Sequence, residues 1–242
     1  MGLNPIYFVD FDGTITAGDL SSELAAYFGG SVYMDIEKKY RQGEIPIRTW
    51  LQSIAEILPA DMELLLEKTL KWAKIRSGFD YFLKHAKKQG SPVFIASDGF
   101  GFYIEPVMKK YGFWEHIDAV YRNKTAVGPD HKLKVYTPYA HPVCIICGNC
   151  KAAHVVRAKE KGRPVIYIGD GSNDRFGASW SDHVCARDRL AQSFRKNNFN
   201  YSQWYDFYDI IKVETPGLKD CSESALCSPL GSGVNKNPGN WP

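Results

Sequence analysis

The residues best suited to chemistry are acidic side chains that follow short apolar runs. Asp10 and Asp12 come directly after the apolar run 6–9, within Asp-Phe-Asp-Gly-Thr-Ile-Thr. A carboxylate can attack phosphorus to form an acyl phosphate, and a neighbouring carboxylic acid can protonate the departing alcohol and later activate water. Asp-x-Asp alone is also typical of a solvated turn. Its meaning therefore depends on which other groups reach the same place.

Three later groups complete a set that suits phosphate chemistry. Ser97 follows the apolar run 92–96, Lys151 precedes a helical stretch, and Asp170 and Asp174 follow the apolar run 164–168. Carboxylate oxygens suit a hard divalent cation such as Mg²⁺, which would offset the repulsion between anionic aspartates and phosphate. Lysine supplies a fixed positive charge. A serine and the N–H groups of the following loop can hold phosphate oxygens.

The elements that must position these groups form an α/β fold. Apolar runs separated by the helical stretches 78–89 and 152–161 predict a Rossmann-like parallel sheet with helices on both faces. Residues 142–146 are a shorter candidate strand. Ligands of such sheets bind at the carboxyl ends of the strands, so Asp10, Ser97 and Asp170 are expected at one edge.

The chain divides into a core and insertions. Residues 1–15 and 76–213 are predicted to form the core, and residues 16–75, which have helical spacing, a small inserted α-helical cap. A second insertion, 101–141, is expected to contain a β-hairpin with strands at 119–122 and 132–136 around a turn-rich segment. Residues 214–242 are rich in Ser, Gly, Pro and Asn and are predicted to be a disordered tail.

In this order, the four motifs resemble those of the haloacid dehalogenase-type phosphatase superfamily. The helical insertion after the first motif and Gly-Asp-Gly-Ser-Asn-Asp at 169–174 are similar to the phosphoserine phosphatase branch. A narrower similarity, in the Cys-rich approach to Lys151 and in 185–188 and 205–208, is to methionine-salvage phosphatases of 2-hydroxy-3-keto-5-methylthiopentenyl 1-phosphate. The resemblance to the superfamily covers about residues 5–190 and implies magnesium-dependent hydrolysis of a small phosphorylated metabolite.

The resemblance also implies roles for individual residues. Asp10 would be the nucleophile and Asp12 the acid and base. Mg²⁺ would be held by Asp10, Asp170 and the backbone carbonyl of Asp12, with Asp174 supporting a water on the metal. The residues implied around the phosphate are Ser97, Asp98, Gly99, Lys151 and Asn173. Asp98 departs from the glycine common in the family, and its charge puts the usual pocket shape in question.

The substrate stays open among several alternatives. Phosphoserine would need a carboxylate for its amine, which Asp19 could supply, and an arginine for its carboxylate, for which Arg48 has an unfavourable register. Pyridoxal phosphate and phosphocholine are further candidates. Phosphoryl transfer to an acceptor other than water, as in a mutase, fits the same motifs. A phosphate-binding module without activity is disfavoured because none of the expected catalytic residues is missing.

A second cluster could hold a different metal. His141, Cys144, Cys147 and Cys150 follow one another at steps of three, which is chemically compatible with a structural zinc site. The alternative is that Cys144 fills a strand core and the other cysteines are small residues near Lys151. The alternative is favoured.

Composition restricts the class of protein. The 242 residues include 30 basic and 27 acidic side chains, which are mixed along the chain for a net charge of +3, so nucleic acid is not an expected partner. The N-terminus has no signal-peptide pattern, and there is no apolar run long enough to span a membrane. A cytoplasmic location is therefore expected. The oligomeric state is not readable from the sequence.

Overall fold

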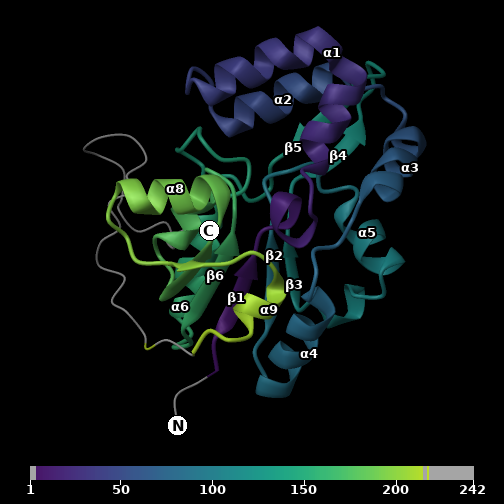
Figure 1. The fold of residues 1–242 in the computed structure, drawn as a ribbon. Coiled ribbons are helices and arrows are strands. Elements are labelled where there is room, and N and C mark those ends of the chain that lie inside the picture. The colour runs from purple at the N-terminus through teal and green to yellow at the C-terminus, as the bar shows by residue number, and fades with distance from the viewer. Residues whose placement is uncertain (1–3, 215–216, 218–242) are drawn as a thin grey trace.

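A parallel sheet of six strands is the centre of the part that this computed structural model describes, residues 4–214 and 217 (Figure 1). Its strands, in spatial order, are β3 (Ala119–Tyr121), β2 (Val93–Ala96), β1 (Ile6–Val9), β6 (Val165–Gly169), β7 (His183–Ala186) and β8 (Ser202–Gln203). The central strand β1 pairs with β2 on one side and with β6 on the other. The strand order therefore reverses at β1, and this is where parallel sheets bind ligands.

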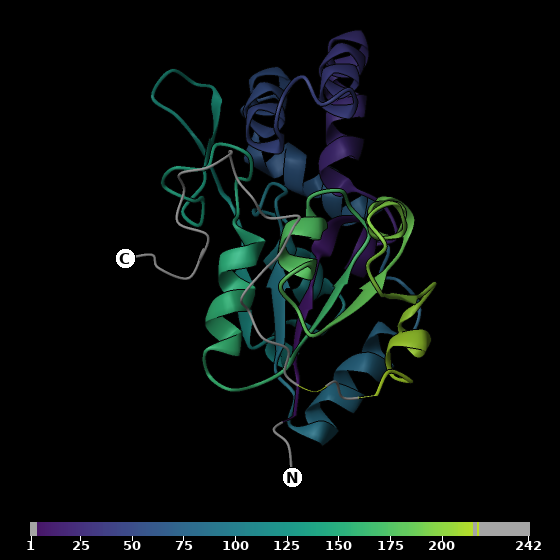
Figure 2. The same ribbon diagram turned by 90° about the vertical axis from the view of Figure 1, so that its left-hand side faces the viewer.

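Side chains of β1 alternate between two cores. Tyr7 and Val9 belong to one cluster, whereas Ile6 and Phe8 belong to the other. Figure 1 and, turned by 90°, Figure 2 show helices on both faces of the sheet. One face carries α4 (Phe79–Gln89), α5 (Ile104–Lys110) and α9 (Phe207–Ile210), and the other α6 (Lys151–Lys159), α7 (Asp174–Ala178) and α8 (Asp188–Lys196). The predicted α/β fold with helices on both faces is confirmed.

Three helices lie between β1 and α4, in the stretch predicted to be a cap. They are α1 (Leu20–Arg41), α2 (Ile47–Ile57) and α3 (Met62–Trp72). Figure 1 shows α1 and α2 packed together beyond the carboxyl ends of the strands. The chain enters and leaves this region at one place, where Thr16 forms an antiparallel bridge with Ile75 and the N–H of Ala17 donates to the carbonyl of Lys74 at 2.8 Å.

The predicted hairpin exists, but its first strand was placed wrongly. It consists of β4 (Lys124–Val127) and β5 (Leu133–Tyr136), which are antiparallel, and β5 packs against α2. Residues 119–121 instead pair with β2 at the edge of the main sheet. The chain turns at Asn123, whose buried side chain donates to the carbonyl of Asp98 at 2.8 Å. A 3₁₀ turn, Trp114–His116, precedes β3.

The candidate strand at 142–146 is also wrong, because this segment is irregular. Pro142 has no backbone donor for a ladder. The guanidinium of Arg48 donates to the carbonyls of Cys144 and Cys147 at 2.7–2.9 Å. The backbone N–H of Arg48 donates to the carbonyl of Ile146 at 3.0 Å. Carbonyl groups that a strand would use are thus bound by the start of α2.

Two further expectations concern the ends and the membrane. The predicted tail at 214–242 lies outside the described residues except for positions 214 and 217. Among the helices that are described, none combines the length and apolar character needed to cross a membrane.

Candidate active site

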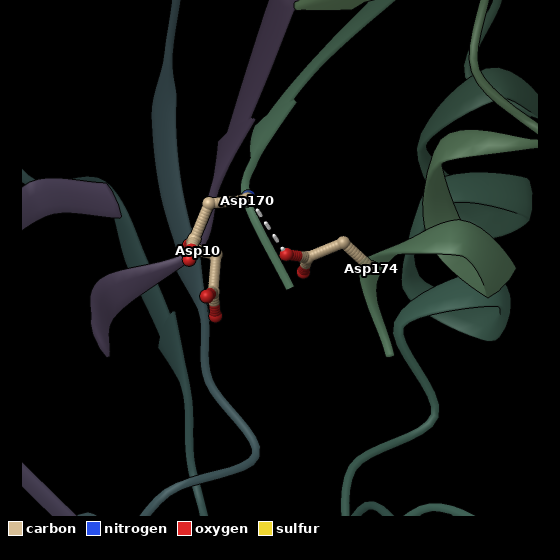
Figure 3. A group of neighbouring side chains, drawn as sticks. All are labelled: Asp10, Asp170 and Asp174. Atoms are coloured by element: carbon tan, nitrogen blue, oxygen red, sulfur yellow. Dashed lines mark hydrogen bonds between the residues drawn. The ribbon is translucent and has the colours of Figure 1, made fainter. Parts of the chain in front are cut away.

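Three aspartates meet at the carboxyl edge of the sheet. Asp10 follows β1, Asp170 follows β6, and Asp174 begins α7 one turn later. One carboxylate oxygen from each lies within 4.8 Å of the others, and Figure 3 shows the three side chains together. In the described part of the chain this is the only group of three or more acidic, histidine or cysteine side chains placed to hold a metal. All its donor atoms are oxygens, the type that Mg²⁺ prefers.

The turn after β1 brings Asp10 and Asp170 into register. Gly13 has a left-handed backbone (φ 80°), and a Cβ atom there would collide with the carboxylate of Asp170. The hydroxyl of Thr14 donates to Asp170 Oδ1 at 2.7 Å. Arg76, which directly follows the cap in sequence, donates to the carbonyls of Gly13 and Thr14 at 2.5 and 3.0 Å and so holds this turn, Phe11–Ile15.

Lys151 is the positive charge of the site. It is the first residue of α6, with 3% of its surface exposed, and its Nζ donates to Asp10 Oδ1 at 2.7 Å and to Asp174 Oδ1 at 2.6 Å. Burial alone would lower the pKa of Lys151, but the charges of Asp10 and Asp174 raise it well above its ordinary value. The ammonium group is therefore retained in the buried site.

Asp174 positions its neighbours. Besides Lys151, it accepts from the hydroxyl of Tyr167 at 2.7 Å and from the N–H groups of Asp170 and Gly171 at 3.1 and 2.8 Å. Both of its oxygens therefore carry two donors. This leaves Asp10 and Asp170 as the carboxylates better suited to direct contact with a cation.

The acidic cluster carries uncompensated repulsion. Burial and then the charge of Asp174 raise the pKa of Asp10 well above its ordinary value, against the opposing effect of Lys151. Burial and Asp174 raise the pKa of Asp170 to about 7. A divalent cation would relieve this repulsion and lower both pKa values. The geometry and the chemistry of the cluster thus fit Mg²⁺.

Asp12 is held apart from this cluster. Its Oδ1 accepts from the N–H of Leu20 at 3.0 Å, and its Oδ2 accepts from the hydroxyl of Tyr103 at 2.5 Å. Burial and then the charge of Asp19 raise the pKa of Asp12 well above its ordinary value. A raised pKa makes a carboxyl group better suited to act as a general acid.

The loop after β2 brings Ser97, Asp98 and Gly99 to the same edge of the sheet, and one oxygen of Asp98 faces the backbone before Lys151. Ser97 Oγ accepts from the N–H of Gly99 at 3.1 Å. Asp98 Oδ1 accepts from the N–H of Asn149 at 2.8 Å. The charge of Asp98 thus anchors the segment that leads into Lys151.

Asn149 joins three elements and was missed by the sequence analysis. Its side chain donates to the carbonyls of Ser97 and Tyr121 at 3.0 and 2.8 Å, and its Oδ1 faces Nε2 of His154 at 2.7 Å. Burial lowers the pKa of His154 to about 3, so the ring is neutral and donates this bond. His154 also stacks on Tyr121, with ring centroids 3.9 Å apart. The network fixes the start of α6.

A cavity of about 350 Å³ lies between these residues and the cap. We call its cap side the roof, which consists of Tyr33, Glu37, Tyr40, Arg41, Ile47 and Trp50. Glu37 is buried and accepts from Trp50 Nε1 at 2.9 Å and from Arg41 Nε at 2.6 Å. The hydroxyl of Tyr40 accepts from Asn173 Nδ2 at 3.0 Å and thereby links roof and core.

The structure brings most of the predicted site residues to this cavity. Those lining it are Asp10, Asp12, Asp19, Ser97, Asp98, Gly99, Lys151, Asp170, Asn173 and Asp174. Arg48 is not among them, because its guanidinium binds the loop at 144–147. Within the described residues, His141, Cys144, Cys147 and Cys150 are not brought together as a metal-holding group.

The roof residues of α1 share a signal that the sequence carried. Tyr33, Glu37, Tyr40 and Arg41 recur at helical spacing and so lie on one face. Aromatic side chains at such spacing also suit ordinary core packing, and nothing in the sequence marks Glu37 and Arg41 as members of a pocket. Helical spacing alone does not say that this face turns to the cavity.

The chain belongs to the haloacid dehalogenase-like hydrolase family, whose model matches residues 7–178. It is similar to the 2-hydroxy-3-keto-5-methylthiopentenyl-1-phosphate phosphatase of Lysinibacillus sphaericus (strain C3-41), with 29% identity over 217 residues, 87% of this chain and 94% of that protein. The protein of the same name from Bacillus pumilus (strain SAFR-032) is 27% identical over 222 residues, 90% of this chain and 94% of that protein.

Solved structures support the same fold. A phospho-aspartyl intermediate analogue of phosphoserine phosphatase aligns with a TM-score of 0.65 over 88% of this chain and 99% of that one, at 21% identity. A substrate-bound phosphoserine phosphatase gives the same TM-score at 19% identity, with 88% and 98% covered. The family resemblance predicted from the motifs is confirmed.

Proposed function

We propose that this protein hydrolyses the phosphomonoester of a small metabolite through a phosphoryl group carried transiently by Asp10. The observation that supports this most strongly is the placement of Lys151 between Asp10 and Asp174, beside Asp170, at the reversal point of the sheet. Positive charge and oxygen ligands converge there on a buried carboxylate that ends a strand.

Each residue has a role in the proposed reaction. An oxygen of Asp10 attacks phosphorus while the bond to the alcohol oxygen breaks, and Asp12 gives its proton to that oxygen. Asp12, now anionic, takes a proton from water as the water attacks the phosphoryl group. The bond between Asp10 and phosphorus then breaks, which frees the carboxylate of Asp10 and releases inorganic phosphate. Lys151 holds Asp10 and balances negative charge throughout.

Mg²⁺ is the cofactor that we propose for the site, held by Asp10 and Asp170 with Asp174 supporting them. When bound, it supplies the positive charge that offsets the repulsion between the carboxylates and the phosphate. The backbone carbonyl of Asp12 is a further proposed ligand. Ser97, Gly99 and Asn173 line the same cavity and are proposed to bind phosphate oxygens.

The first substrate to test is 2-hydroxy-3-keto-5-methylthiopentenyl 1-phosphate, after which the relatives are named. The roof supports a substrate with an uncharged, partly apolar body, because Ile47 and Trp50 are buried there and Arg41 is paired with Glu37. Phosphoserine has weaker support, since Arg48, the arginine considered for its carboxylate, binds backbone carbonyls instead.

Hydrolysis of a panel of phosphate esters tests this proposal. The panel contains the methionine-salvage ester, phosphoserine, pyridoxal phosphate, phosphocholine and 4-nitrophenyl phosphate, each with Mg²⁺. Asp10→Asn is expected to lower turnover of every substrate by on the order of 10⁴-fold, because an amide is not a competent nucleophile. Asp130→Asn, an exposed aspartate in the hairpin turn, is the matched control. Release of phosphate by Asp10→Asn at the wild-type rate would refute the mechanism.

A further inference from the structure

The carboxyl group of Asp12 is fixed at both oxygens by donors from different parts of the molecule. Leu20, whose N–H binds Oδ1, is the first residue of cap helix α1. Tyr103, whose hydroxyl binds Oδ2, directly precedes core helix α5. Two donors on two oxygens set the plane of a carboxyl group, which otherwise rotates freely about χ2. The orientation of Asp12 thus depends on the cap and the core together.

Tyr103 is itself placed with little freedom. Its side chain is fully buried, and its ring lies against Phe11 and Phe102 at centroid distances of 5.9 and 5.1 Å. Gly99 leaves room for the contact, because a Cβ atom there would collide with both the Tyr103 hydroxyl and Asp12 Oδ2. A buried tyrosine hydroxyl with a fixed ring can hold a partner in one direction only.

The hydrogen of the Tyr103 hydroxyl has a defined direction. Ser21 Oγ lies 2.7 Å from the Tyr103 oxygen and accepts from the N–H of Phe100 at 3.2 Å. Because Tyr103 donates to Asp12, Ser21 must donate to Tyr103. A series of hydrogen bonds with one donor direction therefore runs from Ser21, in the first turn of α1, through Tyr103 to Asp12.

We propose that Tyr103 is a positioning residue for the proton donor of the reaction, and that Ser21 and Leu20 make this positioning depend on the docked first turn of α1. This inference rests on the proposed phosphatase function. In that reaction Asp12 transfers its proton to the ester oxygen as its bond to phosphorus breaks. Tyr103 keeps its own proton and only holds Asp12 Oδ2, so the carboxyl group faces the leaving oxygen.

The leaving group separates this role from a purely structural one. An alkoxide is a poor leaving group and requires the proton, whereas 4-nitrophenolate departs readily without it. Loss of acid positioning should therefore slow alkyl esters selectively, while a general distortion of the site should slow both. The ratio of kcat/KM for an alkyl phosphate to that for 4-nitrophenyl phosphate reports the difference.

Tyr103→Phe keeps the ring and removes the hydroxyl. We expect kcat/KM for an alkyl phosphate to fall by about tenfold or more, and by less than the roughly 10²–10⁴-fold that general acid catalysis as a whole contributes, because Asp12 itself remains. The kcat/KM for 4-nitrophenyl phosphate should change by less than about threefold, because 4-nitrophenolate does not need the proton that Asp12 donates. Tyr111→Phe, which also removes a hydroxyl hydrogen bond, to the carbonyl of Ala73, is the matched control and should leave the ratio unchanged.

Further variants keep the test decisive. Adding Tyr103→Phe to Asp12→Asn should cause no additional loss on the alkyl ester, because there is no acid left to position. If Tyr103→Phe does not fold, as judged by thermal unfolding, Ser21→Ala should show the same selectivity with a smaller loss. Equal losses on both esters, or an unchanged ratio, would overturn the role of Tyr103. Wild-type protein that hydrolyses neither ester would overturn the proposed function, and this role with it.

Discussion

The core side of the cavity and its roof are built in different ways. On the core side, Asp10, Lys151 and Asp174 are fixed by short, buried hydrogen bonds at the ends of strands and at helix starts. The roof consists of one face of α1 and part of α2, which pack on each other. The polypeptide enters and leaves the cap at the bridge between Thr16 and Ile75. Changes on the core side should therefore alter the chemistry, whereas changes in the roof should alter which substrate is used.

Metal removal should have the largest effect, because every substrate depends on the positive charge that the metal supplies on the core side. Chelation of divalent cations is expected to abolish hydrolysis of every substrate, including 4-nitrophenyl phosphate, and re-added Mg²⁺ should restore it. Binding should also raise the melting temperature. At a hundredfold excess over its Kd, a ligand of the native state stabilises by about 2.7 kcal/mol. Full activity after exhaustive chelation would contradict the assignment of the acidic cluster.

Lys151→Met should impair both chemistry and stability. The variant leaves Asp10 and Asp174 buried without their cation, and breaking a buried ion pair from one side typically costs about 3–5 kcal/mol. Urea denaturation measures this change in the free energy of unfolding. Lys84→Met, at an exposed ion pair with Asp80, is the control and should cost about 1 kcal/mol or less. A Lys151 variant with normal stability and turnover would contradict the claim that the core side carries the chemistry.

A roof substitution should act on substrate preference. Trp50→Phe removes the donor to Glu37 and reduces the apolar surface above the cavity. We expect KM for the preferred alkyl ester to rise by a few-fold, roughly the effect of 1 kcal/mol, with a smaller change for 4-nitrophenyl phosphate. Trp72→Phe, on α3 and outside the cavity lining, should change neither value. An equal loss of kcat on both substrates would mean that the roof also serves the chemistry.

The last expected effect is on stability alone and is a pH dependence from His154. Its pKa is about 3 in the folded protein against 6.5 for an ordinary histidine. Between these values the unfolded chain binds the extra proton, so stability should fall as pH decreases below about 6.5. His154→Gln retains a donor toward Asn149 and does not titrate. Its free energy of unfolding should therefore decline less than that of the wild type between pH 7 and 5; identical declines would rule His154 out as the source.

The sequence predicted the core side better than the roof for a physical reason. Asp10, Ser97 and Asp170 follow apolar runs, and parallel strands necessarily bring their carboxyl ends to one edge. The hairpin was misplaced because the short run Ala-Val-Tyr-Arg at 119–122 fits either a hairpin or an edge strand, and only its pairing with β2 decides. The segment 142–146 looked like a strand, but Arg48, far away in sequence, binds its carbonyls. A separate tertiary contact, the N–H of Asn149, binds the side chain of Asp98.

Roof residues were harder to place because the packing of α1 and α2 sets which helix face meets the cavity. Tyr33 and Trp50 are aromatic residues at helical spacing, a pattern that more often indicates core packing than a pocket. Glu37 has a local partner in Arg41, one helical turn along α1, but a surface ion pair would look the same in the sequence. Its buried partner Trp50 is brought to it only by the packing of α2 on α1. Tyr103 likewise reaches Asp12 from 91 residues away.

The most direct test of the central claim is detection of the phosphoryl group on Asp10. Protein mixed with substrate and Mg²⁺ is quenched in acid during turnover, digested, and analysed by mass spectrometry. We predict a phosphorylated peptide with the modification at Asp10, absent from Asp10→Asn and present in Asp130→Asn. Sustained turnover with no phosphoryl group on Asp10, or with the group on another residue, would contradict the account.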